Sequence, residues 1–454
     1  MRSLDEPGRI HVVGVAGAGM GPLAKLLVAM GHRVTGSDLH PGPSVDELRR
    51  LGVETWQGSR PERMTSCELV VASSAVPGSD PELRAAEAAG VPVWERPELL
   101  EMLTARMPTI GVTGTHGKTT STALAINAAR ALGLDPSFIV GGDLVDIGTN
   151  AHLGTDDILM LEADEAFGTF THLRFRGLMV TNVDSDHLEH YGTRENLEAT
   201  FGAVVDGVAG PVVVGVDDPG GRRLARRTRR PGYGTSPDAE WRITEVVPGP
   251  SHVTFRLGGR FRPARVTVGR PGLHTARNAC GVLALLAELG YDPADAIAGM
   301  VDFGGVRRRL EVRATVAGVT ILDSYAHHPT EVSADLDAIA PIDRNRLWVV
   351  FQPHLYSRTG ALAAEFGKAL AAADRLVVTD VYGARETPVP GVTGALVADA
   401  ARLGGVEVEY VPRLEDVAGF VADRVESGDL VLTLGAGDIT SLPDGLAESL
   451  GDSA

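Results

Sequence analysis

The sequence predicts an α/β protein whose sheets are mainly parallel. Apolar, β-branched runs alternate with amphipathic stretches rich in Ala and Leu along most of the chain, for example 10–15 with 22–30 and 110–113 with 119–132. This alternation is typical of βαβ units. The chain has 454 residues, about three times the roughly 150 residues of one domain. Its 55 glycines are about twice the usual share of roughly 7%, which indicates many tight turns or ligand-binding loops.

Two breaks divide the chain into three expected domains. At 106–108 a helix-like stretch ends at a proline before a new strand, and at 304–309 a Gly-Gly pair precedes a basic cluster. We therefore expect domains at 1–107, 108–306 and 307–454. Short alternating strands at 241–268, with Gly258 and Gly259 as a hairpin turn, predict an antiparallel edge in the middle domain.

Composition and charge exclude several classes of protein. Lys and Arg number 42 against 59 Asp and Glu, so the net charge of −17 repels nucleic acid. The arginines at 222–230 lack interleaved aromatic residues and have the spacing of a solvated helix face. No apolar stretch reaches the roughly 18 residues of a membrane span, and the first residues lack a basic signal region. Cys67 and Cys280 have no CxxC partner. We expect a cytoplasmic protein with buried thiols and neither nucleic-acid nor membrane partners.

A first glycine-rich turn, at 14–21, joins a predicted strand to a predicted helix. Bare backbone there can approach a phosphate of a nucleotide-type ligand, or can serve only tight helix packing. The spacing GxxGxG does not match the GxGxxG dinucleotide fingerprint. Asp38, after the strand at 33–36, is expected either to accept a hydrogen bond from a ribose or base or to cap a turn. The residues assigned to this candidate substrate site are Gly14, Gly17, Ala18, Gly19, Met20, Asp38, Ser73 and Ser74.

A second turn, at 113–120, is far more specific. It follows the strand at 109–112 and opens an Ala-rich helix, as a phosphate-binding loop does. We expect Lys118 to neutralise the β- and γ-phosphate oxygens and the Thr119 hydroxyl to ligate Mg²⁺. The spacing GxxGKTT is two residues shorter than GxxxxGK[ST], and ATP or GTP binding is favoured over a helix-capping turn. The residues assigned to nucleotide binding here are Gly114, Thr115, His116, Gly117, Lys118, Thr119 and Thr120.

Two further strand ends offer candidate metal ligands. Glu162 ends the apolar run at 158–161, where a phosphate-bound Mg²⁺ needs a hard oxygen ligand. His187 follows the strand at 178–182 and can reach a second divalent ion or orient the phosphoryl group. A purely structural histidine is the alternative.

In the last third of the chain, polar and aromatic residues gather after three predicted strands. They lie at 323–329, 351–358 and 435–438, at the edge where α/β sheets place ligands. These groups suit a small zwitterion, because Arg358 can hold a carboxylate and a nearby histidine can accept an amine proton. Zinc ligation by the histidines at 327, 328 and 354 is less favoured, since adjacent histidines tend to point apart.

Together these motifs resemble those of the Mur ligases of peptidoglycan synthesis. The matching segments, in order over almost the whole chain, are the glycine turn at 14–21, GTHGKTT at 114–120, EADE at 162–165, TNVDSDHLEHY at 181–191, GVRRR at 305–309, YAHHPTEV at 325–332, FQPH at 351–354 and LGAGDI at 434–439. YAHHPTEV and FQPH are more diagnostic than the phosphate loop.

The resemblance implies a Rossmann-like N-terminal domain that holds a UDP-sugar, a central P-loop ATPase domain with a mostly parallel sheet, and a Rossmann-like C-terminal domain that brings the amino acid. The implied activity is ATP-dependent ligation of L-alanine to the carboxylate of UDP-N-acetylmuramate through an acyl phosphate, by a monomer or homodimer. By the family pattern Lys118 contacts the ATP phosphates, Thr119 and Glu162 serve one Mg²⁺, His187 helps to hold a second, Asn278 lies near the adenine, and Tyr325, His327, His354 and Arg358 face the amino acid.

The chain departs from the family pattern at a few positions, and other functions stay open. Ala166 and Phe167 replace the last residues of EADESD, Ser324 replaces a second acid, Leu355 an arginine and Thr275 an asparagine. The alternatives are a ligase that joins a recycled peptide to the same UDP-sugar, a folylpolyglutamate synthetase relative, a nicotinamide-dependent oxidoreductase, and a non-catalytic protein that binds UDP-sugar and ATP. The first glycine turn argues against the folate relative, and the GKTT loop argues against the oxidoreductase.

Overall fold

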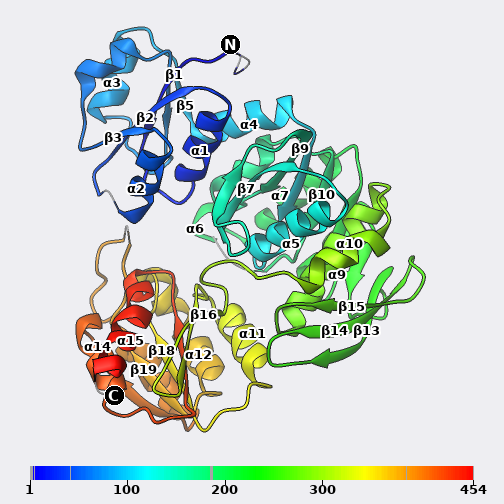
Figure 1. Ribbon diagram of the computed structural model, residues 1–454, viewed down its shortest axis with the longest axis vertical. Helices are drawn as coiled ribbons and strands as arrows, with labels where there is room; N and C mark the ends of the chain where they lie inside the picture. Colours follow the sequence, from blue (N-terminus) through cyan, green and yellow to red (C-terminus); the bar gives the residue numbers. More distant parts are fainter. Residues whose placement is uncertain (1–3, 5, 41, 185–187, 385, 453–454) are drawn as a thin grey trace. The chain divides into compact units, whose positions relative to one another are not determined.

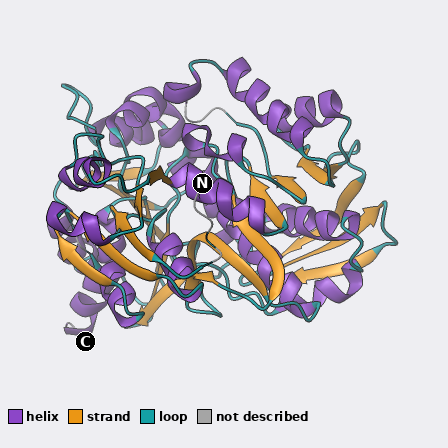
Figure 2. Ribbon diagram, turned by 90° about the horizontal axis from the view of Figure 1, so that it is seen from above, coloured by secondary structure: helices purple, strands orange, loops and turns teal. Residues whose placement is uncertain are grey.

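A computed structural model describes residues 4, 6–40, 42–184, 188–384 and 386–452 (Figure 1). The chain divides into two compact units, one of Met1–Glu245, Phe255–Thr267 and Arg277–Gly304 and the other of Val246–Thr254, Val268–Ala276 and Gly305–Ala454. Within them the strands form sheets of five, ten and six strands, with helices packed against the strands (Figure 2). The fold is α/β with three mainly parallel sheets, as the sequence predicts.

The first sheet has the order β3-β2-β1-β4-β5, and all its pairs are parallel. Its elements are β1 (Arg9–Val13), α1 (Gly21–Ala29), β2 (Arg33–Asp38), α2 (Pro43–Arg50), β3 (Glu54–Gln57), the 3-10 helix η1 (Pro61–Ser66), β4 (Leu69–Ala72), α3 (Pro81–Ala88), β5 (Val93–Glu95) and α4 (Arg96–Arg106). Val12 and Val71 pack in one apolar cluster with α1 and α4, whereas Val13 and Val70 pack in another with α3. Alternate strand residues therefore face helices on both sides, as in a Rossmann-like sheet.

The second sheet has the order β15-β14-β13-β12-β11-β10-β6-β9-β7-β8. Its elements are β6 (Thr109–Thr113), α5 (Lys118–Ala131), β7 (Pro136–Leu144), β8 (Thr149–His152), β9 (Asp156–Glu162), the 3-10 helix η2 (Ala166–His172), β10 (Gly177–Val180), α6 (Leu188–Tyr191), α7 (Arg194–Gly207), β11 (Val212–Gly215), α8 (Pro219–Thr228), β12 (Gly232–Gly234), β13 (Trp241–Pro248), β14 (Val253–Gly259), β15 (Ala264–Val268), α9 (Leu273–Glu288) and α10 (Pro293–Val301). The strands from β7 to β13 are parallel, and β8 pairs antiparallel with β7 at one edge. The phosphate loop thus follows an inner strand, β6, between β9 and β10.

The third sheet has the order β16-β17-β21-β18-β19-β20, in which β16 alone is antiparallel to its neighbour. Its elements are β16 (Glu311–Val316), β17 (Val319–Ser324), α11 (Pro329–Ile339), β18 (Leu347–Phe351), α12 (Tyr356–Leu370), β19 (Arg375–Val378), α13 (Ala395–Leu403), β20 (Glu407–Tyr410), α14 (Leu414–Ala422), β21 (Leu430–Leu434), the 3-10 helix η3 (Asp438–Ser441) and α15 (Leu442–Asp452). Val349 packs with α11 and α12, whereas Val350 packs with α14 and α15. This sheet too is covered by helices on both faces.

Some local predictions need correction. Gly258 and Gly259 lie at the end of β14, and the turn before that strand is at 249–252, where the Gly249 N–H donates to the His252 carbonyl at 2.9 Å. Both cysteines are free thiols, but only Cys280 is fully buried, and Cys67 is partly exposed. Among the described residues, no helix combines the length and apolar character needed to cross a bilayer.

The arginine-rich stretch forms helix α8, and neighbouring carboxylates balance its charge. The pairs are Arg223 Nε with Glu198 Oε2 at 3.0 Å, Arg226 Nη2 with Asp238 Oδ2 at 3.2 Å, and Arg227 Nη2 with Asp206 Oδ2 at 3.3 Å. These contacts explain the arginines as a solvated face paired with acids.

Candidate ATP and substrate sites

Two glycines shape the loop between β6 and α5. Gly114 and Gly117 have φ of +126° and +81°, which side chains rarely adopt. A Cβ on Gly114 would lie 2.1 Å from Thr181 Oγ1 on the segment after β10, so this position excludes any side chain. Helix α5 begins without a side-chain cap and has no acidic residue in its first turn. Its first N–H groups and the positive end of its dipole are therefore suited to bind an anion.

Lys118 is held inside this loop by carbonyl and carboxylate oxygens. Its Nζ donates to Gly114 O at 2.8 Å, to Thr115 O at 3.2 Å and to Glu165 Oε2 at 2.7 Å. Burial lowers the pKa of Lys118, but the charges of Glu165 and Asp164 outweigh it, so this pKa lies above its ordinary value. The ammonium therefore stays charged and can neutralise phosphate oxygens.

Glu162 and Thr119 lie side by side at the same sheet edge. Because β6 and β9 are parallel neighbours, with Val112 opposite Glu162, the end of β9 meets the start of α5. Thr119 Oγ1 donates to Glu162 Oε1 at 2.9 Å, and the Gly141 N–H donates to Oε2 at 2.6 Å. A hydroxyl and a carboxylate are hard oxygen ligands, so this pair fits Mg²⁺.

Residues that we assigned no role also shape the loop. The Asn182 side chain makes two hydrogen bonds to the backbone of His116. Its Oδ1 accepts from His116 N and its Nδ2 donates to His116 O, both at 2.9 Å. The Asp184 N–H donates to Thr115 Oγ1 at 2.9 Å. Both residues belong to the TNVDSDH segment, so this motif could have identified them from the sequence. His187 of the same segment lies outside the described residues.

Asn278 of helix α9 reaches the phosphate loop. A Cβ on Gly117 would lie 3.0 Å from Asn278 Oδ1, so the amide sits directly over that glycine. Three residues earlier, where the family pattern has an asparagine, Thr275 Oγ1 donates to the Pro271 carbonyl at 2.7 Å. The Thr275 hydroxyl therefore makes a local hydrogen bond at the start of α9.

The first glycine-rich turn is fixed to the end of β2. The N–H groups of Gly14 and Val15 donate to Ser37 O at 2.8 and 3.0 Å. Asp38 caps the turn, since its Oδ2 accepts from Ala16 N at 3.0 Å and its Oδ1 from His40 N at 2.9 Å. Asp38 was expected either to bind a ribose or base or to cap a turn. Its hydrogen bonds in this structure are those of a turn cap.

The other residues assigned to this turn differ in their access to a ligand. Ser73 follows β4, and its Cβ would lie 3.1 Å from a Cβ on Gly14, whereas Ser74 is exposed. Met20 is turned inward, because its side chain is buried in the core and its N–H donates to Gly17 O at 2.9 Å. The structure therefore leaves Met20 no group directed at a ligand, contrary to our prediction.

In the C-terminal domain the four residues predicted to face an amino acid come together. The rings of Tyr325 and His327 have centroids 5.2 Å apart, and those of His327 and His354 are 5.7 Å apart. Arg358 Nη1 lies 3.4 Å from His354 Nδ1. Tyr382, which carries no recognisable motif, stacks on His354 at 5.9 Å and was missed.

His327 has the orientation and the pKa direction of a base. Its Nδ1–H donates to Tyr325 O at 3.0 Å, which leaves the lone pair on Nε2. Burial lowers the pKa of His327 although Glu331 opposes it, so the imidazole is neutral near pH 7. His328 instead caps α11, where its Nδ1 accepts from Thr330 N at 3.4 Å. The two histidines thus make different contacts, and among the described residues no group that could hold a metal ion contains both of them.

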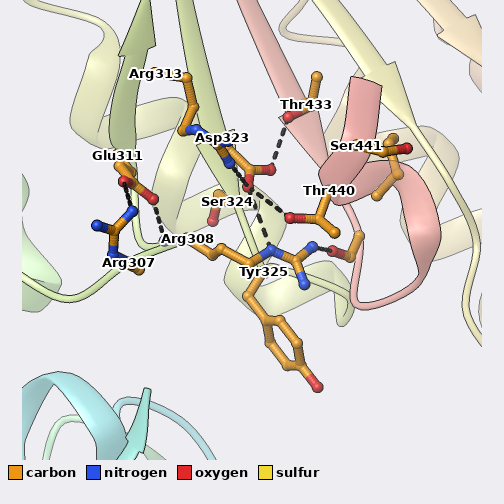
Figure 3. A network of polar contacts seen from close by, with 12 residues as sticks. Arg307, Arg308, Glu311, Arg313, Asp323, Ser324, Tyr325, Thr433, Thr440 and Ser441 are labelled. Atoms are coloured by element: carbon orange, nitrogen blue, oxygen red, sulfur yellow. Dashed lines mark hydrogen bonds and ion pairs between the residues drawn. The ribbon is translucent and has the colours of Figure 1, made fainter. Parts of the chain in front are cut away.

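A buried network fixes the strand end that carries Tyr325 (Figure 3). Asp323 accepts from Thr433 Oγ1 at 2.8 Å and from Arg308 Nε at 3.3 Å, and Arg308 Nη2 donates to Gly435 O at 2.7 Å. Burial raises the pKa of Asp323 in spite of Arg308. The GVRRR and LGAGDI segments are joined through this network, and the Arg308 guanidinium lies 5.1 Å from the centre of the Tyr325 ring.

The acid missing at Ser324 is replaced from a neighbouring helix. Ser324 Oγ donates to Asp335 Oδ2 of α11 at 2.5 Å. Burial raises the pKa of Asp335 to about 6, although the Ser324 hydrogen bond lowers it. A carboxylate therefore lies beside this strand end, contributed by another segment.

Models of three Mur ligase domains match this chain in order. The Mur ligase family catalytic domain matches residues 9–107, the Mur ligase middle domain matches 112–286, and the Mur ligase glutamate ligase domain matches 308–437. The chain is 43% identical over 446 residues to the UDP-N-acetylmuramate–L-alanine ligase of Kineococcus radiotolerans, covering 96% of this chain and 94% of that one. It is 40% identical over 463 residues to the enzyme of that name from Thermobifida fusca, covering 99% and 98%.

Solved structures show the same fold. The UDP-N-acetylmuramate–alanine ligase of Thermotoga maritima matches with a TM-score of 0.85 and 26% identity, over 98% of this chain and 100% of that one. A murein peptide ligase of Psychrobacter arcticus matches with a TM-score of 0.72 and 23% identity, over 98% and 99%. With three family domains matched in order and relatives at this identity over nearly its whole length, the chain belongs to the Mur ligase family, among its UDP-N-acetylmuramate–L-alanine ligases.

Proposed function

We propose that this enzyme joins L-alanine to the carboxylate of UDP-N-acetylmuramate at the expense of ATP, forming a C–N bond in peptidoglycan precursor synthesis. The observation that carries this conclusion is the 40–43% identity, over nearly the whole chain, to relatives with that named activity. The murein peptide ligase shares the fold at 23% identity, so the recycled-peptide alternative has weaker support. The non-catalytic alternative is disfavoured because the loop, carboxylate and histidine groups required for chemistry are all present.

We assign one ligand to each proposed domain. Residues 1–107 would bind the UDP-sugar at the first glycine turn, 108–306 would bind ATP at the phosphate loop, and 307–454 would bind the amino acid. Each assignment rests on a turn at the carboxyl end of a parallel sheet.

The first half-reaction needs positive charge around two anions. A carboxylate is a poor electrophile, so it must first be phosphorylated, with its oxygen attacking the γ-phosphorus of ATP and ADP leaving. Lys118 and the first N–H groups of α5 lower the repulsion between carboxylate and phosphate. Thr119 and Glu162 would hold Mg²⁺, which supplies further charge neutralisation when bound. His187 remains a proposed ligand of a second ion.

The second half-reaction needs a neutral amine. Arg358 would pair with the alanine carboxylate, and His327 would accept the amine proton on Nε2 as the C–N bond forms and phosphate leaves. His354 lies between these two residues and would position Arg358 through the contact at 3.4 Å. Tyr325 would line the same pocket. We keep a cytoplasmic location and a monomer or homodimer as predictions.

ADP release in the presence of UDP-N-acetylmuramate and a panel of amino acids tests the proposal. We expect release that depends on both the sugar nucleotide and free L-alanine. Preference for a tripeptide would favour the recycling ligase, and ligand binding without ADP release would favour the non-catalytic alternative.

A further inference from the structure

An arginine outside the recognised motifs lies against the first glycine-rich turn. Arg96 is the first residue of α4, directly after β5. A Cβ on Gly19 would lie 2.9 Å from Arg96 Nε and 3.1 Å from its Cζ. The φ of Gly19 is outside the left-handed region, so backbone conformation does not demand glycine there. A side chain at position 19 would instead push the Arg96 guanidinium group away from the turn.

This guanidinium is poorly satisfied by the protein itself. Arg96 Nε is buried and has no hydrogen-bond partner among the described residues, and no ion pair of Arg96 occurs within that part of the chain. A buried, unpaired charged donor is unfavourable. A cation in the first turn of a helix also faces the positive end of the helix dipole.

The two acids next to Arg96 in the first turn of α4 make other contacts. Glu95 and Glu98 form the capping box of α4, in which Glu98 Oε2 accepts from the Glu95 N–H at 2.7 Å. Their carboxylates therefore satisfy backbone N–H groups at the helix start. Among the described residues, the charge of Arg96 is therefore available to a bound anion.

The turn beside Arg96 presents more donors of the same kind. Helix α1 starts at Gly21 without a side-chain cap and without an acidic residue in its first turn. Within the described chain, the N–H groups of Ala18 and Gly19 have no acceptor. Backbone donors and a guanidinium thus share one short segment, which is the chemistry that binds phosphate.

We propose that Arg96 binds the diphosphate of the UDP-sugar and that Gly19 lacks a side chain to admit it. The inference rests on the proposed function and adds a binding residue from β5–α4 to the residues of the glycine turn. Arg96 would make the site discriminate a nucleoside diphosphate from the bare nucleoside.

Calorimetric titration of the full chain with UDP and with uridine tests this inference. The variants are Arg96→Ala, Gly19→Ala and both together, with Arg84→Ala as a matched control, since Arg84 is an exposed arginine of the same domain. We expect Arg96→Ala to weaken UDP binding by about 10-fold or more and to leave uridine binding within 2-fold, because one charge-assisted contact is lost. Arg84→Ala should change neither. Gly19→Ala should weaken UDP binding in the parent protein but have little further effect once Arg96 is removed.

Two results of these titrations would overturn the inference. They are unchanged UDP binding by a folded Arg96→Ala protein and an equal loss for UDP and uridine. A further titration with UDP-N-acetylmuramate completes the test, because a loss confined to that ligand would place the sugar's carboxylate against Arg96 and would also overturn the inference. Melting temperatures show whether each variant is folded. The proposed function fails separately, if the parent protein binds UDP but does not ligate L-alanine.

Discussion

Glu331 contacts His327 through both its backbone and its ring. Glu331 Oε2 accepts from the His327 N–H at 3.0 Å and lies 3.4 Å from His327 Nδ1. Glu331 is in the first turn of α11, and His327 lies just before the N-cap residue His328, so the contact joins the helix start to the segment that enters it. This carboxylate favours a proton on Nδ1 and thereby keeps Nε2 available as the base.

Replacing Glu331 by Gln should slow ligation and shift its pH dependence. Burial already lowers the pKa of His327, and loss of the Glu331 charge should lower it further. The fall of kcat on the acidic side of the pH–rate profile (its acidic limb) should therefore move to lower pH. Near pH 8, kcat should fall about 10-fold, because the His327 ring is less well oriented. Steady-state rates between pH 5 and 9 check this.

Two variants provide the controls for Glu331. Glu331→Asp should shift the acidic limb less than Glu331→Gln does. Glu365 is an exposed acid on α12, and Glu365→Gln should leave the pH–rate profile unchanged. A uniform drop in rate without a shift of the limb would mean that Glu331 only stabilises the helix.

Replacing Lys118 by Ala should remove ligation and leave UDP binding intact. The ammonium is held at the phosphate loop by Glu165 and two carbonyls, and no other lysine approaches this loop among the contacts of the described residues. Loss of one such charge where negative charge develops typically lowers rates by about 10²–10³-fold. ADP release and UDP titration measure the two effects, with exposed Lys368→Ala as the control. Turnover above a tenth of the parent rate would refute the role of Lys118.

Gly114→Ala should disrupt the phosphate loop far more than the same change at Gly133. Both glycines have positive φ, +126° and +81°, so both variants carry backbone strain of about 1 kcal/mol or more. A Cβ at 114 also meets Thr181 Oγ1 at 2.1 Å, whereas a Cβ at 133 meets nothing within 4 Å. We expect Gly114→Ala alone to abolish binding of an ATP analogue, measured by titration. Equal losses in both variants would show that strain, not the collision, is decisive.

The sequence predicted those parts of the site that follow from strand order. Thr119 and Glu162 could be paired in advance because parallel strands bring their carboxyl ends to one edge, and the β6–β9 register does this. Tyr382 and Arg96 could not be found this way. Each is a single residue in a segment without a motif, and only the close packing of distant segments brings it to a site.

Two further positions show that residues of one motif can have different surroundings. Met20 stands within the glycine turn, yet its side chain faces the core because α1 begins one residue later. Ser324 departs from the family pattern, but Asp335 supplies a carboxylate from the next helix. Sequence spacing indicates which residues are near a ligand, whereas side-chain direction depends on local backbone geometry.

Asp335→Asn should stabilise the protein at pH 7.5 and stabilise it much less, by about a third as much, at pH 4.5. Burial raises the pKa of Asp335 to about 6, above the roughly 3.9 of an unfolded chain. Between these two values the folded state binds more protons than the unfolded state, so the free energy of unfolding falls as pH rises. Above pH 6 the penalty is complete, of the order of 2–3 kcal/mol. The amide removes this penalty and keeps an oxygen for the Ser324 hydroxyl.

Calorimetric melting temperatures at the two pH values measure the difference. Asp337 is an exposed acid of the same helix, and Asp337→Asn is the control. A lower melting temperature for Asp335→Asn at pH 7.5 would instead mean that the Ser324–Asp335 hydrogen bond outweighs the cost of burying the charge.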